Sequence, residues 1–564
     1  MRSTQYLAVL LFVALGLATP AHSNPLLDEY LNSWDYRALS YQRQLDMELP
    51  LGKSSFLTTH NSYNSKHYQN LFRYWDPNHI NSVAEQLDMG IRALEYDVHY
   101  FTNQYGNKDL LLCHGQGPHL GCSQFDRRFD LGLMEIETWI RQPKNQQEVI
   151  ILYIEEHIDG HYDMAIDSLE STLGDLIYKP EGCQSLPMSL SKADVLRAGK
   201  QIILIGGSCA DAGWSSYVFN YGYPTDNDTF EPYPNCRTGK YNTDHIQSHL
   251  TRLYEDQTRL SNTFSTPPQR ITAQLMAEAT ACGISTLGLD KLAFFDERLT
   301  AAIWSWEQNH PIKNETLECA ALNNNGRFED VNCENHYRFA CKNNNADEWL
   351  ITDSSGNWQQ GEALCSESFG AEYSFSTPKN GFQHTKLLEA RRNSNSSESI
   401  WIDYSEAQFA GQWIVDKQAP FTKATTQITN PRQLLNGWGY CLETKSPIPL
   451  IGDNLQHNRC DNAPHQQWIL DTEGRLHSGA DSSLCISLAD NSQNKLSIAS
   501  CSSENAIHWQ WGSNNSLRKI ESNEAEIEHP TSLKALNVGF GLFKKQTAKI
   551  SSVNGSKSQQ WHWY

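Results

Sequence analysis

Short unbroken runs of apolar residues, separated by polar stretches, dominate the chain between residues 51 and 293. Five of them stand out, at residues 55–59, 93–98, 110–113, 149–154 and 201–205. Runs of this length predict strands that are buried on both faces, as in a parallel sheet. The periodicity of residues 131–141 predicts one of the helices between them, and residues 271–275 and 286–289 are candidates for later strands. The span is close to the ~250 residues of a (β/α)8 or TIM-type barrel, although a doubly wound sheet has the same pattern.

The pattern changes after about residue 300, where Asn, Ser, Trp and Gly become frequent and long apolar runs are few. Paired cysteines in such a background predict small β-rich modules braced by disulfides. From residue 437 onward a weak threefold repeat ends in Gln466-Gln467-Trp468, Trp509-Gln510-Trp511 and Gln559-Gln560-Trp561. Three units of roughly 40 to 50 residues indicate a repeat architecture with a common core.

The first residues have the pattern of a cleaved signal peptide over residues 1–23. Arg2 precedes an apolar run at residues 6–17, and the small-residue site Ala21-His22-Ser23 follows. The run is shorter than the ~20 residues of a transmembrane helix. We therefore expect an exported protein, extracellular or periplasmic. The 14 cysteines, none in a CxxC zinc pattern, suit that oxidising compartment; the expected pairs include Cys113–Cys122, Cys441–Cys460 and Cys485–Cys501.

The formal charge is -20, from 65 acidic and 45 basic residues. The general field therefore repels nucleic acid and anionic membranes, so we expect no nucleic-acid partner. Any lipid that the protein meets has to be recognised locally. The 16 Trp and 24 Tyr indicate folded domains with aromatic-rich surfaces rather than disorder.

Side chains suited to acid–base and metal chemistry stand on the predicted strands or at their ends. His60 and Asn61 end the first strand, Glu95 and Asp97 lie on the second, His114 ends the third and Glu155 ends the fourth. Residues two apart on a strand point to one face, and the C-terminal strand ends of a parallel barrel build its active site. Oxygens of Asn61, Glu95, Asp97 and Glu155 would form a hard site that suits Ca²⁺, with two histidines beside it.

Structural explanations exist for the same residues. Glu95 and Asp97 could form a salt-bridged face with Arg92 or Arg127, and Glu155 could form an ion pair with a lysine or arginine. A single histidine at a strand end is more often a structural residue than a catalyst. Asp290, which follows the last predicted strand, could face substrate or close the barrel.

The phrases Thr59-His60-Asn61-Ser62, Gly90-Ile91-Arg92-Ala93-Leu94-Glu95-Tyr96-Asp97 and Tyr153-Ile154-Glu155-Glu156-His157 occur in this order and spacing. Together they resemble the catalytic X domain of calcium-dependent phosphatidylinositol-specific phospholipases C, and the similarity covers roughly residues 51–293. The resemblance implies that His60 and His114 are catalytic histidines. It also implies that the calcium ligands are Asn61, Glu95, Asp97 and Glu155.

The resemblance implies a reaction in which the inositol 2-hydroxyl attacks phosphorus, an alkoxide such as diacylglycerol leaves, and a cyclic inositol phosphate forms first. Ca²⁺ would lower the pKa of the hydroxyl and neutralise developing charge. Glu95 or His60 would take the hydroxyl proton, and His114 would protonate the leaving oxygen. The membrane-targeting segments of the multidomain eukaryotic enzymes are not found in this sequence. We therefore expect plain phosphatidylinositol or a glycosylated inositol lipid at a membrane surface rather than a polyphosphoinositide.

The threefold repeat resembles the ricin-type β-trefoil lectin, whose repeats carry a Gln-x-Trp signature; this implies buried tryptophans and glycan-binding loops. Residues 318–341 resemble the second half of a C-type lectin-like domain, while residues 361–365 and 399–402 resemble its first half. A permuted domain of that kind implies the pairs Cys319–Cys333 and Cys341–Cys365. His310-Pro311-Ile312 replaces the usual sugar-reading Glu-Pro-Asn triplet, so we expect a scaffold role there.

These expectations divide the chain into a signal peptide at residues 1–23, a phospholipase C-like α/β barrel at 24–298, a C-type lectin-like α+β region at 299–425 and an all-β trefoil at 430–564. The expected function is an exported phosphodiesterase targeted by carbohydrate-binding modules. A glycerophosphodiesterase or sphingomyelinase D relative shares the barrel, the Glu-x-Asp pair and two histidines. However, Asn61-Ser62 replaces the Arg-Gly that usually follows the first histidine of glycerophosphodiesterases. A lectin or adhesin with an inert barrel is the third possibility.

Overall fold

The structure is a computed structural model that describes most of the chain. It covers residues 25–563 apart from residues 71, 116–118, 225–229, 260–262, 264–269, 313–317, 396, 407–412, 416–430, 462, 472–473, 490–491, 493, 504–505, 512–515, 521–533, 539–545, 553–555, 557 and 560. The predicted signal peptide at residues 1–23 lies outside this part. Among the described helices, none has the length and apolar character needed to cross a membrane. The chain divides into two compact units, the first containing Pro25–Asn430 and the second Pro431–Ile469 and Gly474–Trp561.

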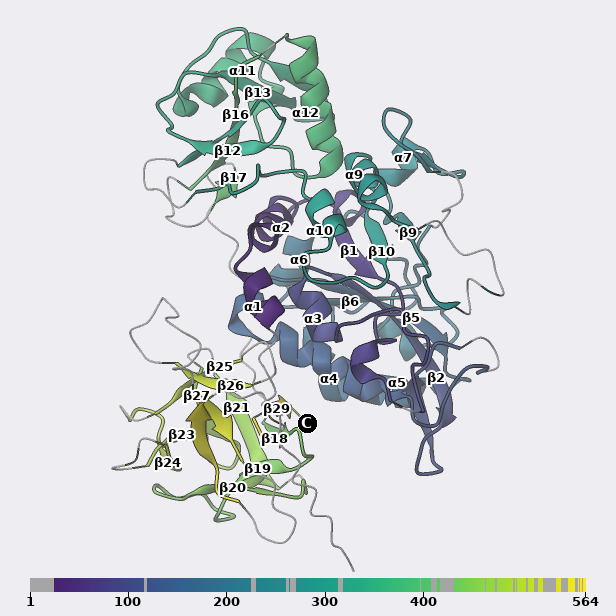
Figure 1. The fold of residues 1–564 in the computed structure, drawn as a ribbon, viewed down its shortest axis with the longest axis vertical. Coiled ribbons are helices and arrows are strands. Elements are labelled where there is room, and N and C mark those ends of the chain that lie inside the picture. The colour runs from purple at the N-terminus through teal and green to yellow at the C-terminus, as the bar shows by residue number, and fades with distance from the viewer. Residues whose placement is uncertain are drawn as a thin grey trace, which may run out of the picture. The chain divides into compact units, whose positions relative to one another are not determined.

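Parallel strands form the centre of the first unit (Figure 1). Six strands pair side by side in the order β9 (Arg252–Tyr254), β10 (Thr286–Leu289), β1 (Phe56–Thr59), β2 (Ala93–Thr102), β5 (Ile150–His157) and β6 (Ile202–Ile205). Phe219 N donates to Leu204 O (2.9 Å) and Arg252 N donates to Pro224 O (3.0 Å), so the segment between these residues links β6 to β9. The sheet is therefore closed, and the doubly wound alternative is wrong.

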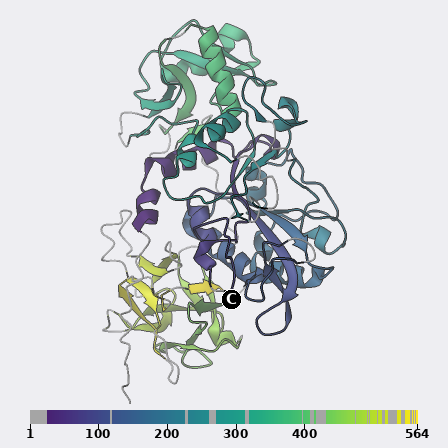
Figure 2. The ribbon, with the colours of Figure 1, turned by 45° about the vertical axis from the view of Figure 1, so that its right-hand side comes forward.

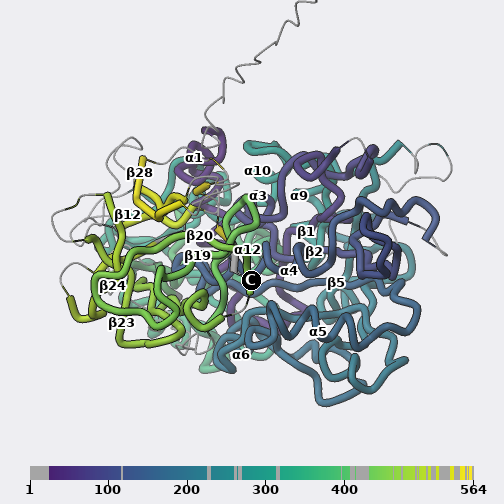
Figure 3. Tube along the Cα trace, turned by 90° about the horizontal axis from the view of Figure 1, so that it is seen from below, coloured from purple at the N-terminus to yellow at the C-terminus, as the bar shows by residue number. Residues whose placement is uncertain are grey.

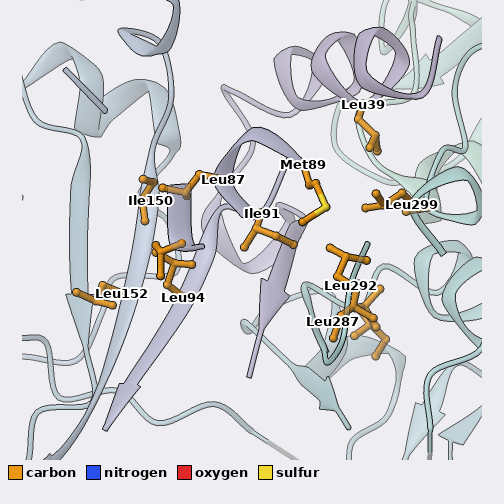
Figure 4. Packing of buried hydrophobic residues seen from close by; sticks show 14 of the residues in the cluster. Leu39, Leu87, Met89, Ile91, Leu94, Ile150, Leu152, Leu287, Leu292 and Leu299 are labelled. Atoms are coloured by element: carbon orange, nitrogen blue, oxygen red, sulfur yellow. The ribbon is translucent and has the colours of Figure 1, made fainter. Parts of the chain in front are cut away.

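The barrel strands are apolar on both faces, which explains their unbroken runs in the sequence. Ala93, Ile151 and Ile203 share one buried cluster with Phe56 on the inner face. Neighbouring residues on the same strands point outward: Figure 4 shows Ile150 beside Leu87 of helix α3 (Val83–Asp88). Because apolar side chains fill the interior of the barrel, polar side chains have room only at the ends of the strands.

Helices cover the outside of the barrel, and their starts are set by capping side chains. Ser82 and Glu85 form a capping box at α3, and Thr272 caps α9 through the Leu275 N–H. The helix predicted at residues 131–141 is α4, which ends at Ile140. The helices are α1 (Pro25–Leu31), α2 (Trp34–Leu45), α4 (Phe129–Ile140), α5 (Tyr162–Thr172), α6 (Lys192–Arg197), α7 (Thr243–Ile246), α9 (Ala273–Ala281) and α10 (Glu297–Ala301).

Two strand predictions were wrong. The third predicted strand, β3 (Lys108–Leu112), runs antiparallel to the far end of β2 and pairs with β4 (Arg127–Arg128), because the turn at Gly106 (φ 81°) reverses the chain. It is the return arm of a hairpin and not a barrel strand. Residues 271–275 form the start of α9 instead of a strand, because the Thr272 cap precedes a run of good helix formers. A second hairpin joins β7 (Phe230–Glu231) to β8 (Arg237–Thr238).

The rest of the first unit is a smaller α+β region. Its strands lie in the order β12 (Phe328–Val331), β11 (Cys319–Leu322), β16 (Ile400–Ser405), β13 (Arg338–Asn343) and β14 (Trp349–Ile351), with β15 (Tyr373–Phe375) on β13 and β17 (Ile414–Val415) on β16. The helices are α11 (Gly361–Phe369) and α12 (Gly381–Asn393). The late strand β16 therefore lies in the middle of the sheet.

This region and the barrel share contacts and a continuous core. Thr385 on α12 donates to Ala281 O at the end of α9 (3.1 Å), and the two helices lie together in Figure 2. The Lys53 ammonium lies 2.7 Å from the Asp347 carboxylate. The boundary predicted at residue 298 falls within α10 and inside one compact unit, and it stays a prediction.

The second unit consists of short antiparallel strands, which can be followed in Figure 3. Trp468, Trp509 and Trp561 are buried as predicted, and Trp468 Nε1 donates to Leu442 O (2.9 Å) while Trp561 Nε1 donates to Leu536 O (3.0 Å). Two of the three repeats thus share this bond, whereas Trp509 Nε1 is buried without a hydrogen bond to the described residues. The strands are β18 (Arg432–Asn436), β19 (Cys441–Thr444), β20 (Leu455–Asn458), β21 (Gln467–Leu470), β22 (Leu476–Ser478), β23 (Leu484–Leu488), β24 (Leu496–Ser500), β25 (His508–Trp511), β26 (Leu517–Ile520), β27 (Lys534–Asn537), β28 (Lys549–Ser552) and β29 (Trp561–Trp563).

All 14 cysteines form disulfides. The five predicted pairs are present, namely Cys113–Cys122, Cys319–Cys333, Cys341–Cys365, Cys441–Cys460 and Cys485–Cys501. Two further pairs, Cys183–Cys209 and Cys236–Cys282, complete the set that the sequence left open.

Candidate active site

The site residues predicted from the sequence gather at one end of the barrel. They are His60 and Asn61 directly after β1, Glu95 and Asp97 on β2, Glu155 on β5 and His114 after β3. The register places Asp97 opposite Glu155 on the neighbouring strand. His114 reaches the same level because β3 returns along β2, and Cys113 N donates to Asp97 O (3.2 Å).

Three carboxylates meet inside this end of the barrel. One oxygen each from Glu95, Asp97 and Glu155 lies within 4.8 Å of the others. Glu95 also binds Arg252 of β9, with 2.6 Å between Oε2 and Nη2. Burial alone would raise the pKa of Glu95, but Arg252 and His60 hold it below its ordinary value.

The predicted alternative, in which Arg92 or Arg127 neutralises the strand carboxylates, is wrong. Arg92 Nη2 lies 2.8 Å from Glu148, and Arg127 Nη1 lies 2.7 Å from Glu135. Both arginines therefore form salt bridges with carboxylates outside the cluster of Glu95, Asp97 and Glu155. Arg252 takes that place instead, and no motif in the sequence marks it.

Asp97 is the buried centre of the cluster. The Tyr63 hydroxyl donates to Asp97 Oδ2 (3.0 Å). The Asn61 amide is oriented so that its nitrogen donates to the same oxygen (2.8 Å) and its oxygen accepts from His60 Nε2 (3.2 Å). Burial, followed by the charges of Glu155 and Glu95, raises the pKa of Asp97 well above its ordinary value.

The donor set fits a hard divalent cation. A cation would relieve the repulsion that disfavours the ionised form of Asp97, and oxygen ligands suit Ca²⁺. In the described part of the chain, no lysine or arginine forms a salt bridge with Asp97 or Glu155. Glu95, Asp97 and Glu155 are the carboxylates that would hold the ion, and Asn61 would join them with its amide turned so that the oxygen faces Asp97.

His60 lies between the carboxylate cluster and a second acid, Asp290. The His60 Nδ1 to Asp290 Oδ1 distance is 3.6 Å, and His79 Nε2 donates to His60 O (2.6 Å). Burial opposes the charged ring, but Glu95 and Asp290 overcome this and raise the pKa of His60 to about 9. Glu95 and Asp290 thus favour the imidazolium form of His60.

His114 has the opposite electrostatic surroundings. Burial and the positive charge of His60 lower its pKa, so the ring is neutral near pH 7. Its Nδ1 lies 3.4 Å from the Asn64 side-chain nitrogen. The Cys113–Cys122 disulfide holds the loop on which the ring stands.

Asp290 was predicted without a definite role, and the structure gives it one. It follows β10, the neighbour of β1, as His60 follows β1, so parallel pairing brings the two side chains together. The order of the strands was the information that the sequence lacked.

Exposed apolar side chains stand on the two loops that follow β1 and β3. Phe72, Trp75 and Leu120 are 55%, 74% and 76% exposed. The loops touch, because Ser123 Oγ donates to Phe72 O (2.7 Å) and the Phe72 and Phe125 rings lie 4.7 Å apart. His60, His114 and these apolar side chains thus share the same two loops.

Comparison with known families assigns both units. The model of the Rv2075c PI-PLC-like domain matches residues 19–296, and the model of the ricin-type beta-trefoil lectin domain matches residues 431–561. Two Mycobacterium tuberculosis proteins, the uncharacterized protein Rv2075c of strain H37Rv and the uncharacterized protein MT2135 of strain CDC 1551, are each 32% identical over 405 residues. Each match covers 67% of this chain and 81% of the relative.

Solved lectin structures are similar to part of the chain. The β-trefoil lectin of the Vibrio vulnificus hemolysin/cytolysin, with bound N-acetyl-D-lactosamine, is 18% identical and covers 24% of this chain and 92% of its own, with a TM-score of 0.19. The C-half of the earthworm R-type lectin, in complex with GalNAc, is 12% identical and covers 24% of this chain and 98% of its own, with a TM-score of 0.19.

Proposed function

The chain belongs to the family of the Rv2075c PI-PLC-like domain, and from this premise we propose that it is an exported phosphodiesterase that cleaves phosphatidylinositol or glycosylated inositol phospholipids. The single observation that carries the proposal is the meeting of two histidines and three carboxylates at one end of a closed barrel. An inert barrel has no structural need for like charges buried together, because each costs free energy unless it is paired.

We propose Ca²⁺ as the cofactor. Bound by Asn61, Glu95, Asp97 and Glu155, it would supply a positive charge that acidifies the inositol 2-hydroxyl and neutralises developing negative charge. The support is the donor chemistry of these side chains and the raised pKa of Asp97.

The residues of the chain divide the proton transfers between them. Glu95, whose pKa lies below its ordinary value, is ionised and is the group suited to accept the hydroxyl proton as the new oxygen–phosphorus bond forms. His60, as an imidazolium, suits stabilisation of the phosphoryl oxygens better than proton abstraction. Of the two bases that the sequence left open, we therefore favour Glu95.

His114 is the proposed general acid. A bound phosphodiester carries negative charge, which favours protonation of a nearby imidazole. The protonated ring would give its proton to the leaving alkoxide as the phosphorus–oxygen bond breaks, so the products are a cyclic inositol phosphate and an alcohol.

The second unit, a ricin-type trefoil, implies glycan binding, and we propose that it docks the enzyme to glycosylated surfaces. Binding through a second module raises the local concentration of the enzyme at its substrate. The exposed Phe72, Trp75 and Leu120 suit contact with lipid, since the charge of -20 gives no general attraction to anionic membranes.

For the α+β region we propose a permuted C-type lectin-like fold with a scaffold role. The support is the central place of the late strand β16 and the Cys319–Cys333 and Cys341–Cys365 pairs. Its contacts with Lys53 and Ala281 brace the barrel.

A direct test is to incubate the mature protein with phosphatidylinositol, glycerophosphoinositol and sphingomyelin, in calcium or in chelator, and to resolve the products by phosphorus NMR. The proposal expects cyclic inositol phosphate in calcium and its loss in His60→Ala. Cleavage of glycerophosphoinositol without a cyclic product, or of sphingomyelin alone, would favour the glycerophosphodiesterase or sphingomyelinase D alternative. Glycan binding with no turnover of any substrate would favour the adhesin.

A further inference from the structure

Two buried asparagines form a bridge between the catalytic histidines. Asn64 and Asn78 stand at the two ends of the loop after β1, and Asn64 Nδ2 donates to Asn78 Oδ1 (2.6 Å). On one side, Asn64 Nδ2 lies 3.4 Å from His114 Nδ1; on the other, Asn78 Nδ2 lies 3.4 Å from His60 Nδ1. The asparagine pair therefore lies against both rings, and Asp76 O (3.2 Å) is a further acceptor for Asn64 Nδ2.

Asn78 also controls the orientation of Asp290. Asn78 Nδ2 and the Gln257 N–H both donate to Asp290 Oδ2, each at 2.8 Å. The other oxygen, Oδ1, is buried and lies 3.6 Å from His60 Nδ1 without a hydrogen bond to the described residues. Because both donors occupy one oxygen, the second oxygen is left to face the histidine.

The backbone holds the two asparagines in register. His79 N donates to Asn64 O (3.0 Å) and Lys66 N donates to His79 O (2.9 Å), so the ends of the loop are joined as a short ladder. Neither amide lies in the cluster of Glu95, Asp97 and Glu155. The pair is therefore placed to act on the histidines and not on the metal site.

An asparagine amide carries both a donor and an acceptor on one planar group. Asn64 can therefore offer its nitrogen to a neutral His114 or, after the amide turns, its oxygen to the Nδ1–H of a protonated ring. An aspartate in the same place keeps the acceptor and loses the donor. Alanine keeps neither.

We propose that the Asn64–Asn78 pair is a positioning device, in which Asn78 directs Asp290 to His60 and Asn64 holds the ring of His114 toward the leaving oxygen. The proposal rests on the proposed function of these histidines. The proposal predicts different effects for the two asparagines. Loss of Asn64 should affect only substrates whose leaving oxygen needs a proton from His114, whereas loss of Asn78 should affect every substrate, because each depends on His60.

The test compares two inositol phosphodiesters, phosphatidylinositol with its alkyl leaving group and a nitrophenyl ester whose leaving group needs no proton. We expect Asn64→Ala to lower kcat for phosphatidylinositol by about 10- to 100-fold, as for other residues that orient a catalytic group, with KM nearly unchanged and little effect on the nitrophenyl ester. Asn78→Ala should lower kcat for both esters.

Asn81→Ala is the matched control, because Asn81 lies on the same loop and its side chain donates to Leu292 O (3.0 Å) rather than to either histidine. Its kcat should match the wild type with both esters. Equal losses of Asn64→Ala on both esters, or no loss on either, would overturn the proposal.

A second measurement does not depend on turnover. Carbethoxylation of each histidine, followed by mass spectrometry, should be several-fold faster at His114 in Asn64→Ala, because a ring nitrogen is released, and unchanged at the exposed His336. An unchanged rate at His114 would overturn the positioning role. If the wild type cleaves neither ester, the proposed function fails, while this comparison still decides whether Asn64 holds the ring.

Discussion

Arg252 Nη2 lies 2.6 Å from Glu95 Oε2, so a buried guanidinium shares the candidate metal site with three carboxylates. The guanidinium is held between aromatic faces, 4.5 Å from the Tyr254 ring centre and 5.6 Å from that of Tyr223. The Arg252 guanidinium thus offsets part of the negative charge of the three carboxylates. The negative charge that remains favours the binding of a metal cation.

Replacing Arg252 should make the site depend more on calcium. Arg252→Gln leaves Glu95 buried beside like charges, which costs about 3 to 5 kcal/mol in chelator. Calcium should restore more stability than in the wild type, because the empty site is more negative. The measurement is the thermal midpoint with calcium and with chelator.

Arg92→Gln is the control, since Arg92 pairs with Glu148 outside the carboxylate cluster. It should destabilise the barrel without changing the calcium-dependent shift. A smaller calcium shift in Arg252→Gln than in the wild type would contradict the assigned metal site.

The exposed side chain of Trp75 should matter only at a lipid surface. Trp75→Ala is expected to lower activity on phosphatidylinositol vesicles several-fold and to leave the cleavage of a soluble inositol phosphodiester unchanged, since the side chain is 74% exposed. Vesicle sedimentation and rate assays at two salt concentrations check this. An equal loss on the soluble ester would mean that the residue shapes the site instead of docking it.

The Cys113–Cys122 disulfide should affect turnover more than stability. It closes a short loop of nine residues that carries His114, so its removal costs only about 2 to 3 kcal/mol but frees the proposed general acid. We expect Cys113→Ser/Cys122→Ser to lower kcat at least tenfold for phosphatidylinositol.

The matched disulfide, Cys441–Cys460, lies in the trefoil and spans 19 residues. Its removal should weaken glycan binding and leave kcat on a soluble substrate unchanged. If both double variants retain full activity, the loop of His114 does not need its disulfide for catalysis.

His384 should make the first unit sensitive to acid. Its ring is buried on α12, Nε2 donates to Gly326 O (2.7 Å), and burial lowers its pKa to about 4. The unfolded chain binds this proton near pH 6.5, so it carries more protons than the folded chain between pH 6.5 and 4. Stability therefore falls as the pH drops through this window, by about 3 kcal/mol in all.

His384→Gln keeps a donor for Gly326 O but does not titrate. Denaturant unfolding at pH 7 and pH 5 should show a smaller loss of stability in the variant than in the wild type. Equal losses would mean that His384 is protonated in the folded protein.

The sequence predicted the parts of the barrel whose signal is local. The strands β1, β2, β5 and β6 were visible because burial on both faces makes their residues uniformly apolar. The strand β9 was missed because only three residues pair and one of them is Arg252. The hairpin arm β3 was misread, since a short apolar run does not reveal the direction of pairing.

The same distinction applies to the site. The six predicted site residues lie together because each stands on or directly after a recognisable strand. The contacts of Arg252 with Glu95 and of Asn78 with Asp290 join elements far apart in sequence, so they depend on strand order and register. No local pattern contains that information.

The most direct test of the account is the rate of cyclic inositol phosphate formation from phosphatidylinositol as a function of free calcium, in the wild type, Asp97→Asn and Asp159→Asn. Asp159 is a half-exposed carboxylate bound to His119 near the barrel mouth, outside the carboxylate cluster, and serves as the control. The account predicts a saturable calcium dependence in the wild type and the control. It predicts that the rate of Asp97→Asn is at least a hundredfold lower. Raising the free calcium to concentrations that saturate the wild type should not restore this rate. A wild-type rate that persists in chelator, or an Asp97→Asn enzyme as active as the control, would contradict it.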